Sequence, residues 1–171
     1  MMRRTLLIAL VLLAALLLQT SLLPAVAIAG FRPDLLLMVT AIVALRDGAL
    51  PGLRVGAVAG LLTDLLLSES HLGLSVVTHV GIAHVLVLVR PYLTTSSPFL
   101  GPAVGFTTAF VGTLVHGILS ILLADSLAGA ATLIVSAVAL GIWATLLWPL
   151  VDSALGRLLE AVPADVPAEA G

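Results

Sequence analysis

The stretch that decides the fold is GLRVGAVAGLLTDLLLSESHLG, residues 52–73. Glycines recur at Gly52, Gly56 and Gly60, so a helix here has a face of small residues that a second helix can approach closely. Asp64 follows inside the same apolar run. A carboxylate within a membrane-spanning run is unfavourable in lipid and normally faces protein or water. The stretch therefore predicts a membrane helix with one packing face and one buried polar group.

The composition of the whole chain agrees with a membrane location. The protein has 171 residues, of which 61% are hydrophobic and 9% are charged, whereas soluble domains contain about a quarter charged residues. The chain has no lysine and a net charge of -2, which argues against a nucleic-acid partner. It has no cysteine, which excludes disulfides and thiolate metal sites. We expect an all-α integral membrane protein whose surroundings are the lipid bilayer.

Six apolar runs predict a bundle of six transmembrane helices. The expected spans are residues 5–23, 31–45, 52–67, 72–89, 102–123 and 127–151. They form a single transmembrane domain, residues 1–157, and residues 158–171 form a short disordered tail. The first run also resembles a signal peptide, but the later runs are equally apolar and favour a retained helix. The second run is short, so it either crosses a locally thinned bilayer or lies partly buried among its neighbours.

The arginines predict the orientation of the bundle. With the N-terminus inside, the cytoplasmic side carries Arg3, Arg4, Arg46, Arg54, Arg90 and Arg157, and the outer side carries Arg32. This distribution follows the positive-inside rule and places both termini in the cytoplasm. Trp148, near the end of the last run, is expected to anchor that helix at the membrane interface.

The polar residues inside the spans do not form a known catalytic pattern. The sequence contains no H-E-x-x-H, no G-x-S-x-G and no P-loop, so we expect no catalytic residues and no cofactor. His79 and His84 are five residues apart, about 140° around a helix, and cannot share a metal from one helix; no metal site is expected. His79 and His116 lie about 12–14 Å from the outer face and Asp64 about 6 Å. Either these three form a polar cluster between helices, or each bonds locally.

Two further features carry alternative interpretations. Asp64 pairs with a histidine or arginine, lines a substrate cavity, or is a protonated carboxyl bonded locally; a structural role is favoured. The glycine face is favoured as internal packing over a partner interface.

At the start of the second run, Pro33 pre-sets the first helical turn, Asp34 caps it, and Arg32 satisfies the carboxylate.

An ordered series of motifs resembles the rod shape-determining MreD family. The series comprises Leu16-Leu17-Leu18-Gln19, Phe31-Arg32-Pro33-Asp34, Gly56-x3-Gly60-Leu61-Leu62-x-Asp64-Leu65-Leu66, Leu72-Gly73-Leu74, and Trp148-Pro149 followed by Arg157. The resemblance extends from about residue 19 to residue 157. One departure is the charged turn LSESH, residues 67–71, where the family often has a Ser-Gly-Ser-like sequence.

The resemblance implies a non-enzymatic membrane scaffold of the bacterial cell-elongation machinery, which synthesises peptidoglycan and sets rod shape. It implies binding and positioning of an MreC-like bitopic protein, within an assembly that includes the RodA glycosyltransferase, a class B penicillin-binding transpeptidase and MreB. The location is the cytoplasmic (inner) membrane. The implied fold is similar to the S-component of energy-coupling-factor transporters, although a shared fold does not carry function.

The alternative function is a substrate-binding subunit of a transporter for a small, vitamin-like molecule. The aromatic content of 4% counts against it, because small-molecule pockets are usually rich in aromatic side chains. The candidate structural or partner-binding residues are Arg32, Pro33, Asp34, Gly56, Gly60, Asp64, Gly73, His79 and His116.

Overall fold

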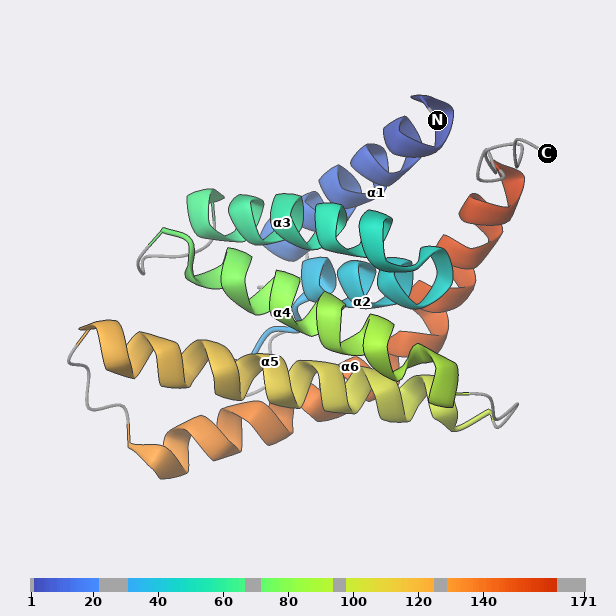
Figure 1. Ribbon diagram of the computed structural model, residues 1–171. Coiled ribbons are helices and arrows are strands. Elements are labelled where there is room, and N and C mark those ends of the chain that lie inside the picture. The colour runs from blue at the N-terminus through green and yellow to red at the C-terminus, as the bar shows by residue number, and fades with distance from the viewer. Residues whose placement is uncertain (1, 22–30, 67–71, 94–97, 125–128, 163–171) are drawn as a thin grey trace.

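The computed structural model describes residues 2–21, 31–66, 72–93, 98–124 and 129–162. These residues form a bundle of α-helices, shown in Figure 1. The helices are α1 (Met2–Ser21), α2 (Leu35–Asp47), α3 (Ala49–Leu66), α4 (Leu74–Val89), α5 (Leu100–Ala124) and α6 (Ala130–Ala161), with a short 3-10 helix, η2 (Arg90–Tyr92), after α4. The predicted all-α architecture is confirmed.

Five of these helices, α1, α3, α4, α5 and α6, are long and apolar enough to cross a membrane. The protein is therefore a multi-pass membrane protein. The remaining helix, α2, has 13 residues and begins four residues later than the predicted second span. At a rise of about 1.5 Å per residue, α2 is too short to cross the hydrocarbon core of about 30 Å unless the bilayer is locally thinned.

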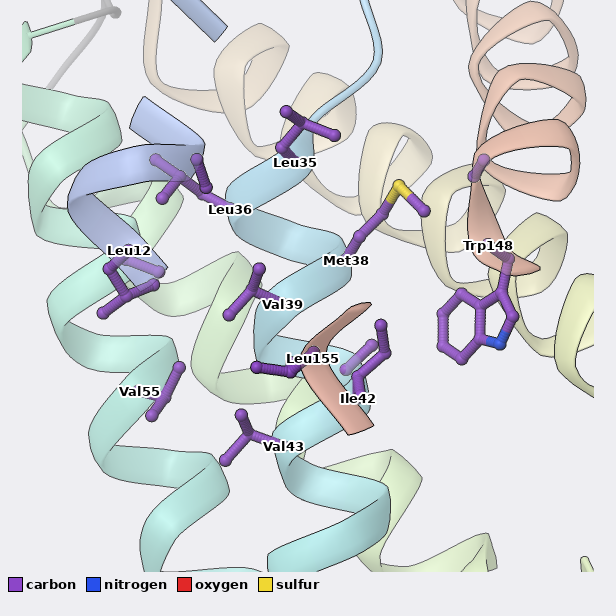
Figure 2. Close-up of a cluster of buried hydrophobic side chains, with 14 of the residues drawn as sticks. Leu12, Leu35, Leu36, Met38, Val39, Ile42, Val43, Val55, Trp148 and Leu155 are labelled. Carbon is purple, nitrogen blue, oxygen red and sulfur yellow. The ribbon is translucent and has the colours of Figure 1, made fainter. Parts of the chain in front are cut away.

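α2 is the centre of the bundle. Every residue from Leu35 to Ala44 is buried, and a helix that is apolar on all sides is stable only when it is surrounded. Figure 2 shows its side chains between Leu12 of α1, Val55 of α3 and Leu155 of α6. Of the two alternatives for the short second run, burial among neighbouring helices describes α2.

The glycine face of α3 packs inside the bundle. A Cβ added at Gly60 would lie 2.5 Å from the Cα of Val76 on α4, and one added at Gly52 would lie 2.7 Å from the Cα of Ala44 on α2. Gly56 is between them, where a Cβ would lie 3.1 Å from the backbone oxygen of His79. These glycines let the backbones of α2, α3 and α4 approach one another closely.

Glycines also bring α5 and α6 together, around a buried tryptophan. The indole of Trp148 lies against Gly101 and Gly105 of α5, where an added Cβ would come within 2.7 Å of the ring. Trp148 is only 3% exposed. The prediction that Trp148 anchors the helix at the membrane interface is therefore wrong. The missing side chains of α5 leave room for the ring inside the bundle.

α6 continues well past the predicted end of the last span. It contains Pro149 within the helix and ends at Ala161, ten residues beyond the predicted boundary. Figure 1 shows that α6 changes direction along its length, as expected where proline removes a backbone hydrogen bond. Residues 158–161, predicted as part of a disordered tail, are therefore helical, and residues 163–171 lie outside the described part of the chain.

The first turn of α1 and the last turn of α6 meet at one end of the bundle (Figure 1). The Arg4 guanidinium donates hydrogen bonds to the backbone oxygens of Val162, at 2.7 Å, and Leu159, at 3.3 Å. We call this the terminal end. The other end, where α2 and α4 begin, is called the opposite end.

Candidate functional site

Asp64 lies near the end of α3 at the opposite end of the bundle. Its carboxylate accepts hydrogen bonds from the backbone N–H groups of Gly73 at 2.8 Å, Ser75 at 3.0 Å and Val76 at 3.4 Å. The first N–H groups of a helix have no partner within the helix and carry its positive dipole. Asp64 is buried and caps α4 from another helix, so it is bonded locally.

Gly73 makes this cap possible. It precedes α4 with φ of 99°, a left-handed conformation that glycine adopts without steric penalty. The turn directs the N–H groups of Gly73 and Ser75 at the same carboxylate. The unusual charged turn, residues 67–71, lies outside the described part of the chain.

The beginning of α2 is capped by two side chains. Asp34 occupies the N-cap position and accepts a hydrogen bond from the N–H of Leu37 at 3.0 Å. Gln19, near the end of α1, accepts from the N–H groups of Leu35 at 3.0 Å and Leu36 at 3.3 Å. Its amide nitrogen donates to Asp34 Oδ1 at 3.4 Å. Asp34 thus takes the predicted capping position.

Two details of this cap differ from expectation. Pro33 precedes the N-cap instead of occupying the first turn of α2, and it is buried. Gln19 caps α2 but was missing from the candidate residues. Its sequence signal was present, because it is the single side-chain amide of α1 and follows a long apolar run.

His79 lies beside this cap with one ring nitrogen free. Its Nδ1 is 2.8 Å from the backbone oxygen of Ser75, and a carbonyl only accepts, so Nδ1 carries a proton. Nε2 lies 3.7 Å from Asp34 Oδ2, beyond hydrogen-bonding distance. The side chain is 3% exposed. Within the described residues, Nε2 has no hydrogen-bond partner.

A cavity of about 300 Å³ opens next to His79. The described residues that line it are Gln19, Arg32, Asp34, Leu37, Thr63, Ser75, Thr78, His79, Ala109, Gly112, Thr113, His116 and Leu140. His79 and His116 therefore lie on the same cavity and not on opposite sides of the bundle. Asp64 is not among the lining residues. The carboxylate that lines the cavity together with the two histidines is that of Asp34.

The remaining predicted residues take separate places. Arg32 lines the cavity and is exposed. Among the described residues Asp34 is bonded by Gln19 and Leu37 and not by Arg32, so the prediction that Arg32 satisfies this carboxylate is wrong. His84 is exposed elsewhere on α4. Gly56 and Gly60 contribute to helix packing and not to the cavity. Within the described residues no group of three histidine, aspartate or glutamate side chains is placed to hold a metal ion. The arrangement is suited to binding a small polar group.

The terminal end contains ion pairs that the sequence did not indicate. Arg4 donates to both carboxylate oxygens of Asp47. Arg46 donates to Asp152 Oδ1 from Nε at 3.0 Å and from Nη2 at 2.8 Å. Arg90 donates to the backbone oxygen of Arg46 at 3.1 Å. These arginines connect the ends of α1, α2, α4 and α6.

A family model for the rod shape-determining protein MreD matches residues 2–157. No curated protein and no solved structure matched the chain, so the similarity to transporter S-components stays a prediction. The match covers nearly all of the helical bundle, including both caps, the glycine face of α3 and the whole cavity lining. The chain therefore belongs to the MreD family and has a role in rod shape determination.

Proposed function

We propose that the protein is a non-enzymatic scaffold subunit of the bacterial cell-elongation machinery. It binds and positions an MreC-like bitopic protein by contact with that protein's transmembrane helix. RodA glycosyltransferase, a class B penicillin-binding transpeptidase and MreB belong to the wider assembly. The family match to a rod shape-determining protein supports this role.

The observation that carries the proposal is the contrast between buried polar groups and the exposed surface. Asp64, Asp34 and Gln19 are engaged in capping helices inside the bundle. The spanning helices expose many large apolar side chains; on α1 they include Leu6, Leu10, Leu13 and Leu17. A surface of this kind packs against lipid or against another transmembrane helix. The apolar surface outside the cavity is therefore suited to association with another transmembrane helix.

We propose that both termini lie in the cytoplasm. Arg4, Arg46 and Arg90 gather at the terminal end, whereas Arg32 is near the opposite end with the cavity, as the positive-inside rule requires. The natural absence of cysteine makes the test direct. In whole cells, a membrane-impermeant maleimide should label a single cysteine in Arg32→Cys and should not label one in Arg3→Cys. Labelling of Arg3→Cys but not of Arg32→Cys would show that the protein has the opposite orientation.

The scaffold role is tested by photo-crosslinking in cells of a rod-shaped host. A crosslinking amino acid is placed at one exposed position per helix: Leu10, Leu61, Val85, Val115 and Leu146. We expect one or two adjacent positions to capture the MreC-like protein, and these identify the binding face. Buried Ile42 is the matched control and should give no adduct. Absence of an adduct from every exposed position contradicts the scaffold role, and retention of a small solute by the same preparation would favour the transporter alternative.

A further inference from the structure

Three threonine hydroxyls around the cavity present oxygen lone pairs and not protons. Thr63 donates to the backbone oxygen of Ala59 at 3.0 Å, Thr78 to that of Leu74 at 2.9 Å, and Thr113 to that of Ala109 at 2.7 Å. A threonine hydroxyl has one proton and two lone pairs. With the proton used inside its own helix, each hydroxyl contributes only acceptor capacity to the cavity.

His79 adds a second kind of acceptor. Because Nδ1 donates to the backbone oxygen of Ser75, Nε2 of the neutral ring bears a lone pair. That atom lies 3.7 Å from Asp34 Oδ2, so with the neutral ring two hydrogen-bond acceptors lie close together. An unpartnered polar atom in a buried position is unfavourable unless a donor is supplied.

Asp34 supplies negative charge at the same point. Its Oδ1 accepts from the N–H of Leu37 and from the amide of Gln19, which leaves Oδ2 directed toward His79. The ion pairs of the described residues give Asp34 no basic partner within 4.0 Å other than His79. Arg32 is exposed, where solvent screens its charge. The cavity lining thus includes one carboxylate and several neutral acceptors, with the exposed Arg32 as its one arginine.

We propose that this cavity binds a primary ammonium group, held by Asp34 Oδ2, His79 Nε2 and the threonine oxygens. An ammonium group has three donors and no acceptor, which complements the lining described above. A volume of about 300 Å³ accommodates an ethanolamine-sized group. The ammonium comes either from a lipid headgroup that carries ethanolamine or from a soluble amine. The scaffold role does not require this site, so the two are tested separately.

The experiment uses the full-length protein in detergent and has two arms. In the lipid arm, native mass spectrometry compares retention of phosphatidylethanolamine with that of phosphatidylcholine, whose quaternary ammonium has no N–H. In the soluble arm, the melting temperature is followed during titration with ethylammonium chloride and with tetramethylammonium chloride at equal ionic strength. Selective binding of the N–H-bearing cation in either arm supports the site and identifies its source. Absence of selectivity in both arms overturns it.

Variants connect the binding to the proposed atoms. Asp34→Asn preserves an N-cap residue but removes the charge, and we expect affinity to fall by about tenfold or more, as for hydrogen bonds to charged groups. His79→Asn keeps a donor toward Ser75 and removes the Nε2 acceptor, and it should weaken binding also. Thr107→Val, on exposed α5 surface, is the control and should bind normally.

The variants give a definite result even if one does not fold. If Asp34→Asn fails to fold, His79→Asn is judged by the same criterion. Unchanged affinity in a folded Asp34→Asn or His79→Asn protein overturns the site. A folded Asp34→Asn protein that loses the amine but still crosslinks to the MreC-like partner separates this inference from the scaffold role.

Discussion

The two ends of the bundle use charged residues differently. At the terminal end, Arg46 and Asp152 form an ion pair whose side chains are 36% and 37% exposed. At the opposite end, the carboxylate of Asp64 is buried and accepts hydrogen bonds from three backbone N–H groups. One end pairs side chains of opposite charge, and the other satisfies the backbone of a helix.

Because of this difference, we expect the charged residues of one end to set the orientation of the protein in the membrane and those of the other end to set its stability. Exposed ion pairs contribute about 0–1 kcal/mol, whereas each buried donor left without a partner costs about 1–3 kcal/mol. Exposed arginines of the terminal end, such as Arg46, therefore affect mainly which side of the membrane that end occupies. The caps of the opposite end affect mainly whether α2 and α4 stay in place. Four experiments test this comparison.

The largest effect is expected from Asp64→Ala. The substitution leaves the N–H groups of Gly73, Ser75 and Val76 without their common acceptor, and we expect a loss of about 3 kcal/mol in the free energy of unfolding. The measurement is unfolding in SDS mixed micelles, followed by the fluorescence of the two tryptophans, of which Trp148 is buried. Asp152→Ala, at the terminal end, is the matched control. Equal losses in the two variants would remove the distinction between the ends.

Gly60→Ala should destabilise the protein by about 2 kcal/mol, the cost of overpacking a filled interior. The added Cβ would lie 2.5 Å from the Cα of Val76, so α3 and α4 must separate and the Asp64 cap must lengthen. Gly81→Ala is the control, because an added Cβ there meets nothing within 4 Å. We expect Gly81→Ala to be neutral or stabilising, since alanine favours helix. A Gly60→Ala protein as stable as wild type would show that the close approach of α3 and α4 is not needed for the cap.

The sequence was sufficient for the helices and for part of the site. Long apolar runs predicted the helices because the bilayer requires continuous helical spans. The spacing of small residues located the packing face of α3, and Pro33-Asp34 located the cap of α2. Helical depth placed His79 and His116 at similar levels, and both line one cavity.

The remainder depends on contacts that hydropathy does not encode. Lipid is as apolar as a leucine side chain, so apolar character did not reveal that α2 is central or that Trp148 is buried against glycines over 40 residues earlier in the chain. Proline is tolerated inside membrane helices, and Pro149 therefore did not end α6. A cluster of Asp64 with the histidines stayed open as one of two alternatives, because the partners of Asp64 are backbone N–H groups, which have no sequence signature.

Gln19→Leu sharpens the comparison within the opposite end, since it removes a cap from α2 and leaves Asp64 untouched. The N–H groups of Leu35 and Leu36 lose their acceptor, and we expect a loss of about 1 kcal/mol, the usual value of a helix cap. Thr20→Val is the control, because Thr20 bonds only within α1 among the described residues. The same SDS unfolding assay applies. A loss larger than that of Asp64→Ala would mean that the cap of α2, and not that of α4, dominates this end.

The smallest effect is expected at the terminal end, where a double-mutant cycle of Arg46→Gln and Asp152→Asn isolates the energy of their ion pair. We expect a coupling of about 0.5 kcal/mol that decreases as salt is added, because the pair is exposed and screened. The pair of Arg4 and Asp47 provides the contrast, with side chains 18% and 7% exposed. Its coupling should be larger and less sensitive to salt, since water screens it less. If the two cycles give equal couplings with equal salt dependence, exposure does not set the strength of these pairs, and the contrast between the two ends must have another physical origin.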